Sequence, residues 1–142
     1  MSLESIARKI EEHKLTNELI ERTNRKERLI LTGASRIAKS LITTSLAKKE
    51  SKKLLVIVPT LEDATRWLPL VQDCGWTKTY LYPSTEVSPY DSIQITSEIL
   101  WGQLQVLSDL LDLENDESIA IIATERSLQP HLPPPEYLKS KC

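Results

Sequence analysis

The sequence RLILTGASRIAKSLITTSLAK, residues 28–48, places a short apolar run, a glycine and an amphipathic segment one after another. Residues 28–32 have the apolar pattern of a buried strand, residues 33–40 follow as a loop, and residues 41–48 open a helix. A strand, a glycine-bearing loop and a helix in this order form the layout of a phosphate-binding loop. The stretch therefore predicts an α/β fold of the P-loop nucleoside triphosphatase type.

The loop itself departs from the pattern G-x-x-x-x-G-K-[ST] that binds phosphate. Gly33, Lys39 and Ser40 occupy three of the four fixed positions, and Ala38 stands where the second glycine belongs. In a working loop the backbone N–H groups surround the phosphates, the lysine reaches the outer phosphates and the hydroxyl holds Mg²⁺. The methyl group of Ala38 and the bulk of Arg36 hinder that close approach. We interpret the loop as a degenerate phosphate site.

A P-loop ATPase also needs an acidic residue after an apolar strand to organise Mg²⁺ and water. The two apolar runs after the loop end in VPT, residues 58–60, and in ATE, residues 123–125. Glu125 is the one candidate. We favour the simpler interpretation that its carboxylate stabilises the N-terminus of a following helix. We therefore predict no catalytic residues, no metal site and no bound cofactor for this chain.

Composition excludes several classes of protein. Of the 142 residues, 40% are hydrophobic and 27% are charged, as in ordinary soluble domains. The net charge of −2 gives no support for binding nucleic acid through bulk charge. Cys74 and Cys142 match no metal or redox spacing. No segment is apolar enough to span a membrane or to act as a signal peptide, so we expect a cytoplasmic protein.

Helical and strand patterns alternate along the chain. Continuous apolar runs such as residues 54–58 are typical of strands covered on both faces of a sheet. Pro69 should kink or shorten the helix that contains it, and the proline-rich tail should be irregular. We expect helices at residues 2–13, 16–23, 35–49, 60–75 and 98–113, and strands at residues 29–31, 54–58, 77–82 and 118–123. This order predicts a single three-layer α/β domain with a mostly parallel sheet.

Four segments together resemble a known family. They are LTGASRIAKSLITTSLA (31–47), LLVIVPTLEDATRW (54–67), YPSTEVSPYDSIQITSEILWGQLQVLSDLL (82–111) and IIATERSLQPHLPPPEYL (121–138). In order and spacing they resemble the N-terminal, UvrB-like region of the bacterial transcription-repair coupling factor. The family's P-x-x-E-x-x-P-Y loop is matched by Pro83, Glu86, Pro89 and Tyr90. The resemblance covers residues 15–138 and divides the chain into an N-terminal helical segment (1–27), a UvrB-like domain (28–129) and a proline-rich exit (130–142).

The resemblance implies a role in nucleotide excision repair. Full-length members are ATP-dependent DNA translocases that displace stalled RNA polymerase and recruit UvrA. Their working ATPase motifs, with ATP and Mg²⁺, lie in a separate C-terminal motor, and the N-terminal region keeps the UvrB-like shape without hydrolysis. The resemblance places the UvrA-contacting subdomain after the proline-rich exit. We therefore expect a fragment whose partners are the remaining domains of a parent polypeptide, and through them UvrA, RNA polymerase and DNA.

Candidate contact residues lie at the expected carboxyl edge of the sheet and at a helix end. Trp76 follows a glycine at a helix end, where partial exposure is expected, and the loop after Tyr82 holds Glu86, Tyr90 and Asp91. Loops at this edge often carry binding residues, although this one also simply joins a strand to a helix. Trp67 and Trp101 lie on amphipathic helices, where core packing is the simpler interpretation.

Two hypotheses from different classes remain open at this point. The chain is either a non-catalytic interaction domain of a repair coupling factor, or a regulatory domain with residual ATP binding. Ala38, Arg36 and the missing acidic motif favour the interaction domain.

Overall fold

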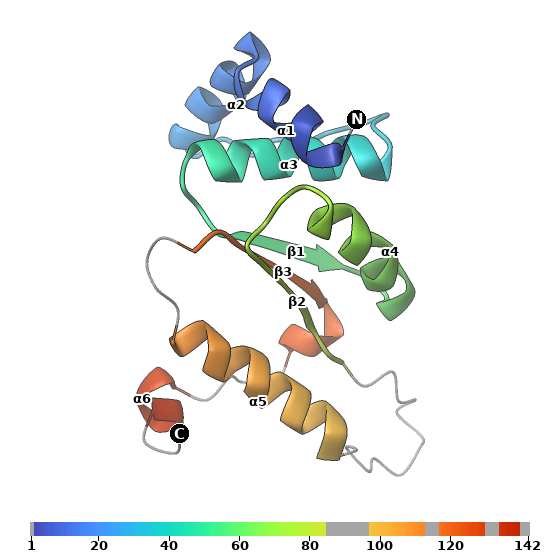
Figure 1. Ribbon diagram of the computed structural model, residues 1–142, viewed down its shortest axis with the longest axis vertical. Helices are drawn as coiled ribbons and strands as arrows, with labels where there is room; N and C mark the ends of the chain where they lie inside the picture. Colours follow the sequence, from blue (N-terminus) through green and yellow to red (C-terminus); the bar gives the residue numbers. More distant parts are fainter. Residues whose placement is uncertain (1, 85–96, 113–116, 130–133, 140–142) are drawn as a thin grey trace.

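Strand β3 (Ile119–Thr124) lies at the centre of a parallel sheet, in a computed structural model that describes residues 2–84, 97–112, 117–129 and 134–139 (Figure 1). It pairs with β1 (Leu54–Val58) along one edge and with β2 (Lys78–Tyr82) along the other. The described part of the chain is thus a small single-domain α/β fold with a three-stranded sheet in the order β1-β3-β2. The three strand positions agree closely with those predicted.

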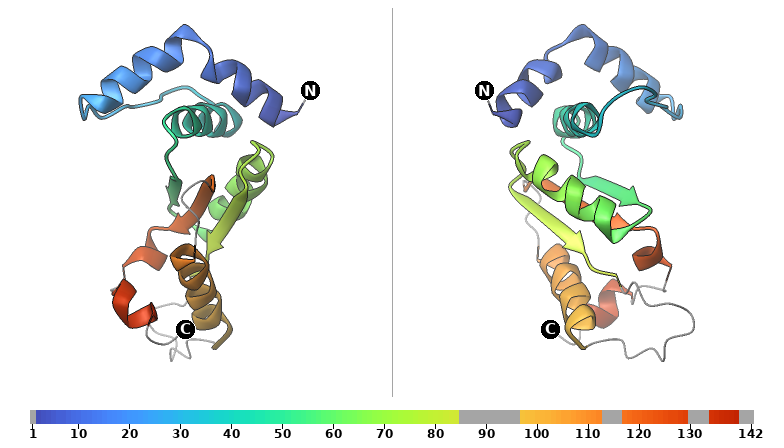
Figure 2. Two further views of the ribbon diagram at one scale, coloured as in Figure 1. Left: turned by 60° about the vertical axis from the view of Figure 1, so that its left-hand side comes forward. Right: turned by 90° about the vertical axis from the view of Figure 1, so that its right-hand side faces the viewer.

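Helices lie on both sides of the sheet. Helices α3 (Arg36–Lys49) and α4 (Leu61–Gln72) lie on one side, and α5 (Ser97–Leu111) lies on the other (Figures 1 and 2). Helices α1 (Leu3–Glu11) and α2 (Lys14–Asn24) lie on the side of α3 that faces away from the sheet. The crossovers through α4 and α5 move in opposite directions across the sheet and use opposite faces. They therefore have the same hand, as expected for parallel crossovers.

Hydroxyl side chains begin three of the helices, at the starts predicted for residues 2, 35 and 60. Ser2, Ser35 and Thr60 each accept a hydrogen bond from a backbone N–H in the first turn of α1, α3 and α4 respectively. Helix α4 continues past Pro69 to Gln72, so the expected shortening does not occur. Pro69 is exposed there, and it removes the one hydrogen bond that its own N–H would donate without ending the helix.

The apolar core has two parts, one on each face of the sheet. The larger part fills the space between the sheet and helices α1, α3 and α4; its buried members are Ala7, Leu41, Val58, Ala64, Val71, Cys74, Trp76, Ala120 and Ile122. The smaller part lies beneath α5 and is formed by Tyr82, Val106 and Ala123, with partly buried neighbours around them. Because β3 contributes side chains to both parts, it joins the two helical layers.

The predicted strand at residues 29–31 is not formed. In the described structure these residues pair with no strand, and the side chain of Ile30 is 75% exposed. The segment runs back along α3 to the start of that helix (Figure 1), with Leu29 and Leu31 partly buried. An apolar run of only three residues does not distinguish a strand from a loop that packs on a helix.

Strand β1 differs from expectation in a related way. Its apolar run predicts burial on both faces, yet Leu55 and Ile57 are 51% and 56% exposed. Leu54 and Val56 pack against the larger core, and Val58 belongs to it. Since β1 is an edge strand and α5 covers β2 and β3, only one face of β1 is covered by described residues.

The proline-rich tail contains a short helix where irregular structure was expected. Helix α6 (Pro135–Lys139) packs against α5, and Leu138 is buried there. Proline suits the first helical position because its missing N–H would have no intrahelical partner there. Pro135 therefore begins a helix, and the expectation of irregular structure is wrong for residues 135–139.

We expect Val56→Asp and Leu55→Asp to have very different effects on stability, although the residues are adjacent. Val56 packs on the core, so a carboxylate there should lower the free energy of unfolding by about 3 kcal/mol or more. Leu55 faces solvent, so the same change should cost less than about 1 kcal/mol. Urea unfolding followed by circular dichroism at low protein concentration measures both. Equal effects would show that the faces of β1 are assigned wrongly.

Candidate functional site

The candidate phosphate loop is shorter than its sequence suggests. Gly33 has a φ of +70°, a conformation that favours glycine, and Ser35 already caps α3. The N–H of Ala38 donates to the Ser35 hydroxyl at 3.2 Å, and the N–H of Lys39 donates to the Ser35 carbonyl at 2.9 Å. Two of the backbone donors that would surround a phosphate, those of residues 38 and 39, are therefore used inside the first turn of the helix.

Ser40, whose position holds Mg²⁺ in a working loop, points into the protein. Its side chain is 0% exposed, and its hydroxyl donates to the carbonyl of Ile37 at 2.8 Å. Lys39 is half-buried on the same helix. The structure thus keeps Gly33, Lys39 and Ser40 in sequence order but does not direct the Ser40 hydroxyl towards a phosphate position.

An open groove of about 640 Å³ lies beside the start of α3, between that helix and α4. Its lining consists of Ser35, Arg36, Ile37, Thr65, Arg66, Pro69 and Leu70. Both arginines are paired with carboxylates of α4: Arg36 with Asp63 at 3.1 Å, and Arg66 with Glu62. These pairs offset the positive charge that an anionic ligand would need. The ion pair of Arg36 also joins α3 to α4.

Glu125 lies where the sequence places it, directly after β3. It is exposed and precedes the short 3₁₀ helix η1 (Arg126–Leu128), and its N–H donates to the carbonyl of Val58 at 2.9 Å. That hydrogen bond closes the carboxyl end of the sheet between β1 and β3. Among the described residues, no three His, Cys, Asp or Glu side chains gather in a way that could hold a metal ion.

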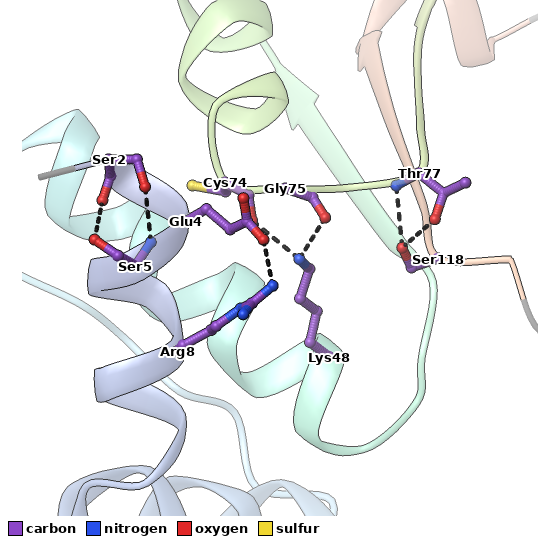
Figure 3. Close-up of polar contacts among 9 residues, drawn as sticks. All are labelled: Ser2, Glu4, Ser5, Arg8, Lys48, Cys74, Gly75, Thr77 and Ser118. Atoms are coloured by element: carbon purple, nitrogen blue, oxygen red, sulfur yellow. Dashed lines mark hydrogen bonds and ion pairs between the residues drawn. The ribbon is translucent and has the colours of Figure 1, made fainter.

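A cluster of polar contacts surrounds Lys48. Its ammonium group donates to the carbonyls of Cys74 at 3.0 Å and Gly75 at 2.6 Å, directly after the end of α4 (Figure 3). The same ammonium lies 5.6 Å from the centre of the Trp76 ring. Lys48 therefore joins the C-terminal part of α3 to the turn between α4 and β2.

Helix α1 closes over this turn. Gly75 has a φ of +80°, and a Cβ there would come within 2.5 Å of the Glu4 side chain. Glu4 also forms an ion pair with Arg8, one turn further along α1 (Figure 3). Gly75 thus suits its backbone conformation, and a larger residue there would also displace the Glu4 side chain.

The expected exposure of Trp76 is not found. The ring is 8% exposed, and its Nε1 donates to the hydroxyl of Thr44 at 3.2 Å, so it belongs to the core. Cys74 is also fully buried beside it, and this burial raises the pKa of its thiol. The other expected contact residues, Glu86, Tyr90 and Asp91, lie outside the described residues.

The prediction for Trp101 is wrong in the opposite direction, since this residue was expected to be buried and is exposed. Its amphipathic helix suggests core packing, but the side chain is 70% exposed on α5, next to the half-exposed Leu100. Trp67, in contrast, packs against the larger core as expected. An isolated helix pattern does not reveal which of two apolar stripes faces the sheet, and α5 carries apolar residues on more than one side.

Comparisons of the chain with protein-family models, with curated proteins and with solved structures find no match. None of the helices in the described ranges is both long enough and apolar enough to cross a bilayer.

We expect Lys48→Met to lower the free energy of unfolding by about 1–3 kcal/mol, because the change removes two charge-assisted hydrogen bonds to backbone carbonyls. The methionine keeps most of the apolar stem. Lys53→Met, at an exposed lysine before β1, serves as the matched control and should change stability by less than about 0.5 kcal/mol. Urea unfolding measures both, and equal effects would mean that Lys48 does not hold the turn.

Proposed function

We propose that the chain is a non-catalytic interaction domain of the transcription-repair coupling kind, built on a P-loop-like fold that no longer binds nucleotide. The burial of the Ser40 hydroxyl supports the loss of nucleotide binding most strongly. A hydroxyl that donates to the Ile37 carbonyl and has no exposed surface does not reach a solvated metal–phosphate complex without unwinding the helix. The family resemblance supplies the link to excision repair.

The exposed apolar residues of α5 support a role in binding another protein surface. Trp101 and Leu100 are successive residues of this helix, and both are accessible to solvent. Tryptophan is enriched among the residues that dominate binding energy, because a large rigid side chain gains much from burial. In this proposal α5 is the surface that meets the remaining domains of a coupling factor, and UvrA, RNA polymerase and DNA are engaged by the assembled protein.

We expect no saturable ATP binding below millimolar concentration, with or without Mg²⁺, in an isothermal titration of the purified chain. Ala38→Gly should not restore binding, since the N–H groups of residues 38 and 39 remain used by Ser35. Ser40→Ala should lower stability by about 1 kcal/mol through its lost hydrogen bond, and should leave the titration unchanged. Low-micromolar affinity that disappears in Lys39→Met would favour the regulatory nucleotide-binding hypothesis.

The interaction itself can be tested with the C-terminal remainder of a coupling factor supplied as a separate polypeptide. We expect calorimetry to detect binding, and Trp101→Ser to weaken it at least about tenfold. Leu15→Ser, at a half-exposed leucine on α2, is the control and should have little effect. Submicromolar binding of UvrA to the chain alone, unchanged by Trp101→Ser, would contradict the proposed surface.

A further inference from the structure

Among the residues that the structure describes, no strand pairs with the outer edge of β1, which is a second exposed surface separate from α5. The carbonyl of Val58 accepts from Glu125 on the side of β3. Backbone groups of successive strand residues point to opposite edges, so those of Leu55 and Ile57 point away from β3, along the free edge. The same two residues carry the exposed apolar side chains of this strand. Both the backbone and the side chains of the edge are therefore available for pairing.

Natural edge strands usually carry a feature that prevents pairing with another chain, such as a charge, a proline or a bulge. The five residues of β1, LLVIV, contain no charge and no proline, and they pair with β3 in unbroken register. Lys52 and Lys53 precede the strand and Pro59 follows it. The positive charge and the proline thus flank the edge without interrupting it.

We propose that two copies of this chain associate by antiparallel pairing of their β1 edges about a two-fold axis at Val56. In this register Leu55 lies opposite Ile57 of the second copy, and the reverse. Both residues direct their N–H and C=O groups outward, so the two pairs form about four backbone hydrogen bonds. The three-stranded sheets become one continuous sheet with β1 and its copy at the centre.

The side chains of the flanking residues fit this register. Leu55 and Ile57 of the two copies form apolar cross-strand pairs on the face that α5 leaves uncovered. Lys53 falls opposite Pro59 of the second copy, so no two lysines oppose each other. The arrangement is isologous, as two-fold dimers require.

A second copy explains the edge better than the chain's own apolar segment at residues 28–32. Leu29 and Leu31 belong to the segment that runs along α3, and both are already partly buried there. Moving this segment to β1 would expose them. Pairing with a second copy costs no such contact. The interface is small beside the roughly 1,200 Å² of stable complexes, so the dimer should be weak and form reversibly as concentration rises.

Sedimentation equilibrium over a concentration series measures the association. We expect the wild-type chain to dimerise reversibly, and Ile57→Lys to weaken the dimer at least about tenfold, because it places an ammonium group in the apolar pair. Ile37→Lys, at a half-exposed isoleucine on α3, should leave the dimer unchanged. Circular dichroism of each variant confirms that the monomer is folded. A wild-type chain that stays monomeric, or equal weakening by both variants, would overturn the proposal.

The register is tested by mixing two charged variants. Position 57 of one copy faces position 55 of the other, so Ile57→Lys mixed with Leu55→Glu should form a heterodimer tighter than either homodimer. Ile57→Lys mixed with Ile57→Glu should gain less, since those positions are not opposite. The reverse ranking would overturn this register. Amide exchange at Leu55 and Ile57 should slow with protein concentration; slow exchange in the dilute monomer would assign the edge to residues 28–32 and overturn the proposal.

Discussion

The pairing of β3 with a strand on each edge is the constraint on which the rest of the structure depends. Ile119 and Ile122 point to opposite faces of the sheet and are both fully buried. Ala120 and Ala123 are small, which lets the helices of each layer approach the sheet closely. Because both parts of the core contain side chains of β3, loss of this strand would remove the surface on which each part packs. The helices above and below would then have no common surface.

This constraint explains which parts of the fold could be predicted from sequence. The run SIAIIA and the run LLVIV carry their strand character in their own residues, and Ser2, Ser35 and Thr60 mark helix starts by local hydrogen bonding. Pairing order is not local. Residues 29–31 are as apolar as a strand but pair with no strand in the described part of the chain, and β1 is as apolar as a central strand although it lies at the edge of the described sheet. Composition records how apolar a segment is, whereas exposure depends on what covers it.

The candidate site shows the same limit at the scale of single residues. The pattern around Gly33, Lys39 and Ser40 indicates a phosphate loop, but Ser35 competes for the backbone donors of the same residues and begins a helix instead. The capping preference of Ser35 was visible in the sequence and could have predicted this outcome. The burial of Trp76 and the exposure of Trp101 could not have been predicted, because each depends on the angle at which a whole segment meets the sheet.

Polar side chains of α3 form hydrogen bonds inside the protein, whereas apolar side chains of β1 and α5 are exposed at its surface. Hydroxyl groups of α3 serve the interior: Ser45 donates to the carbonyls of Ala7 and Leu41, and Thr44 accepts from Trp76. These contacts join α3 to α1 and to the turn after α4, so α3 is a structural support of the domain. Apolar side chains on β1 and α5 remain accessible at the same time. Buried apolar area stabilises an assembly without orienting any reacting group, so this distribution suits a domain that acts by binding other surfaces.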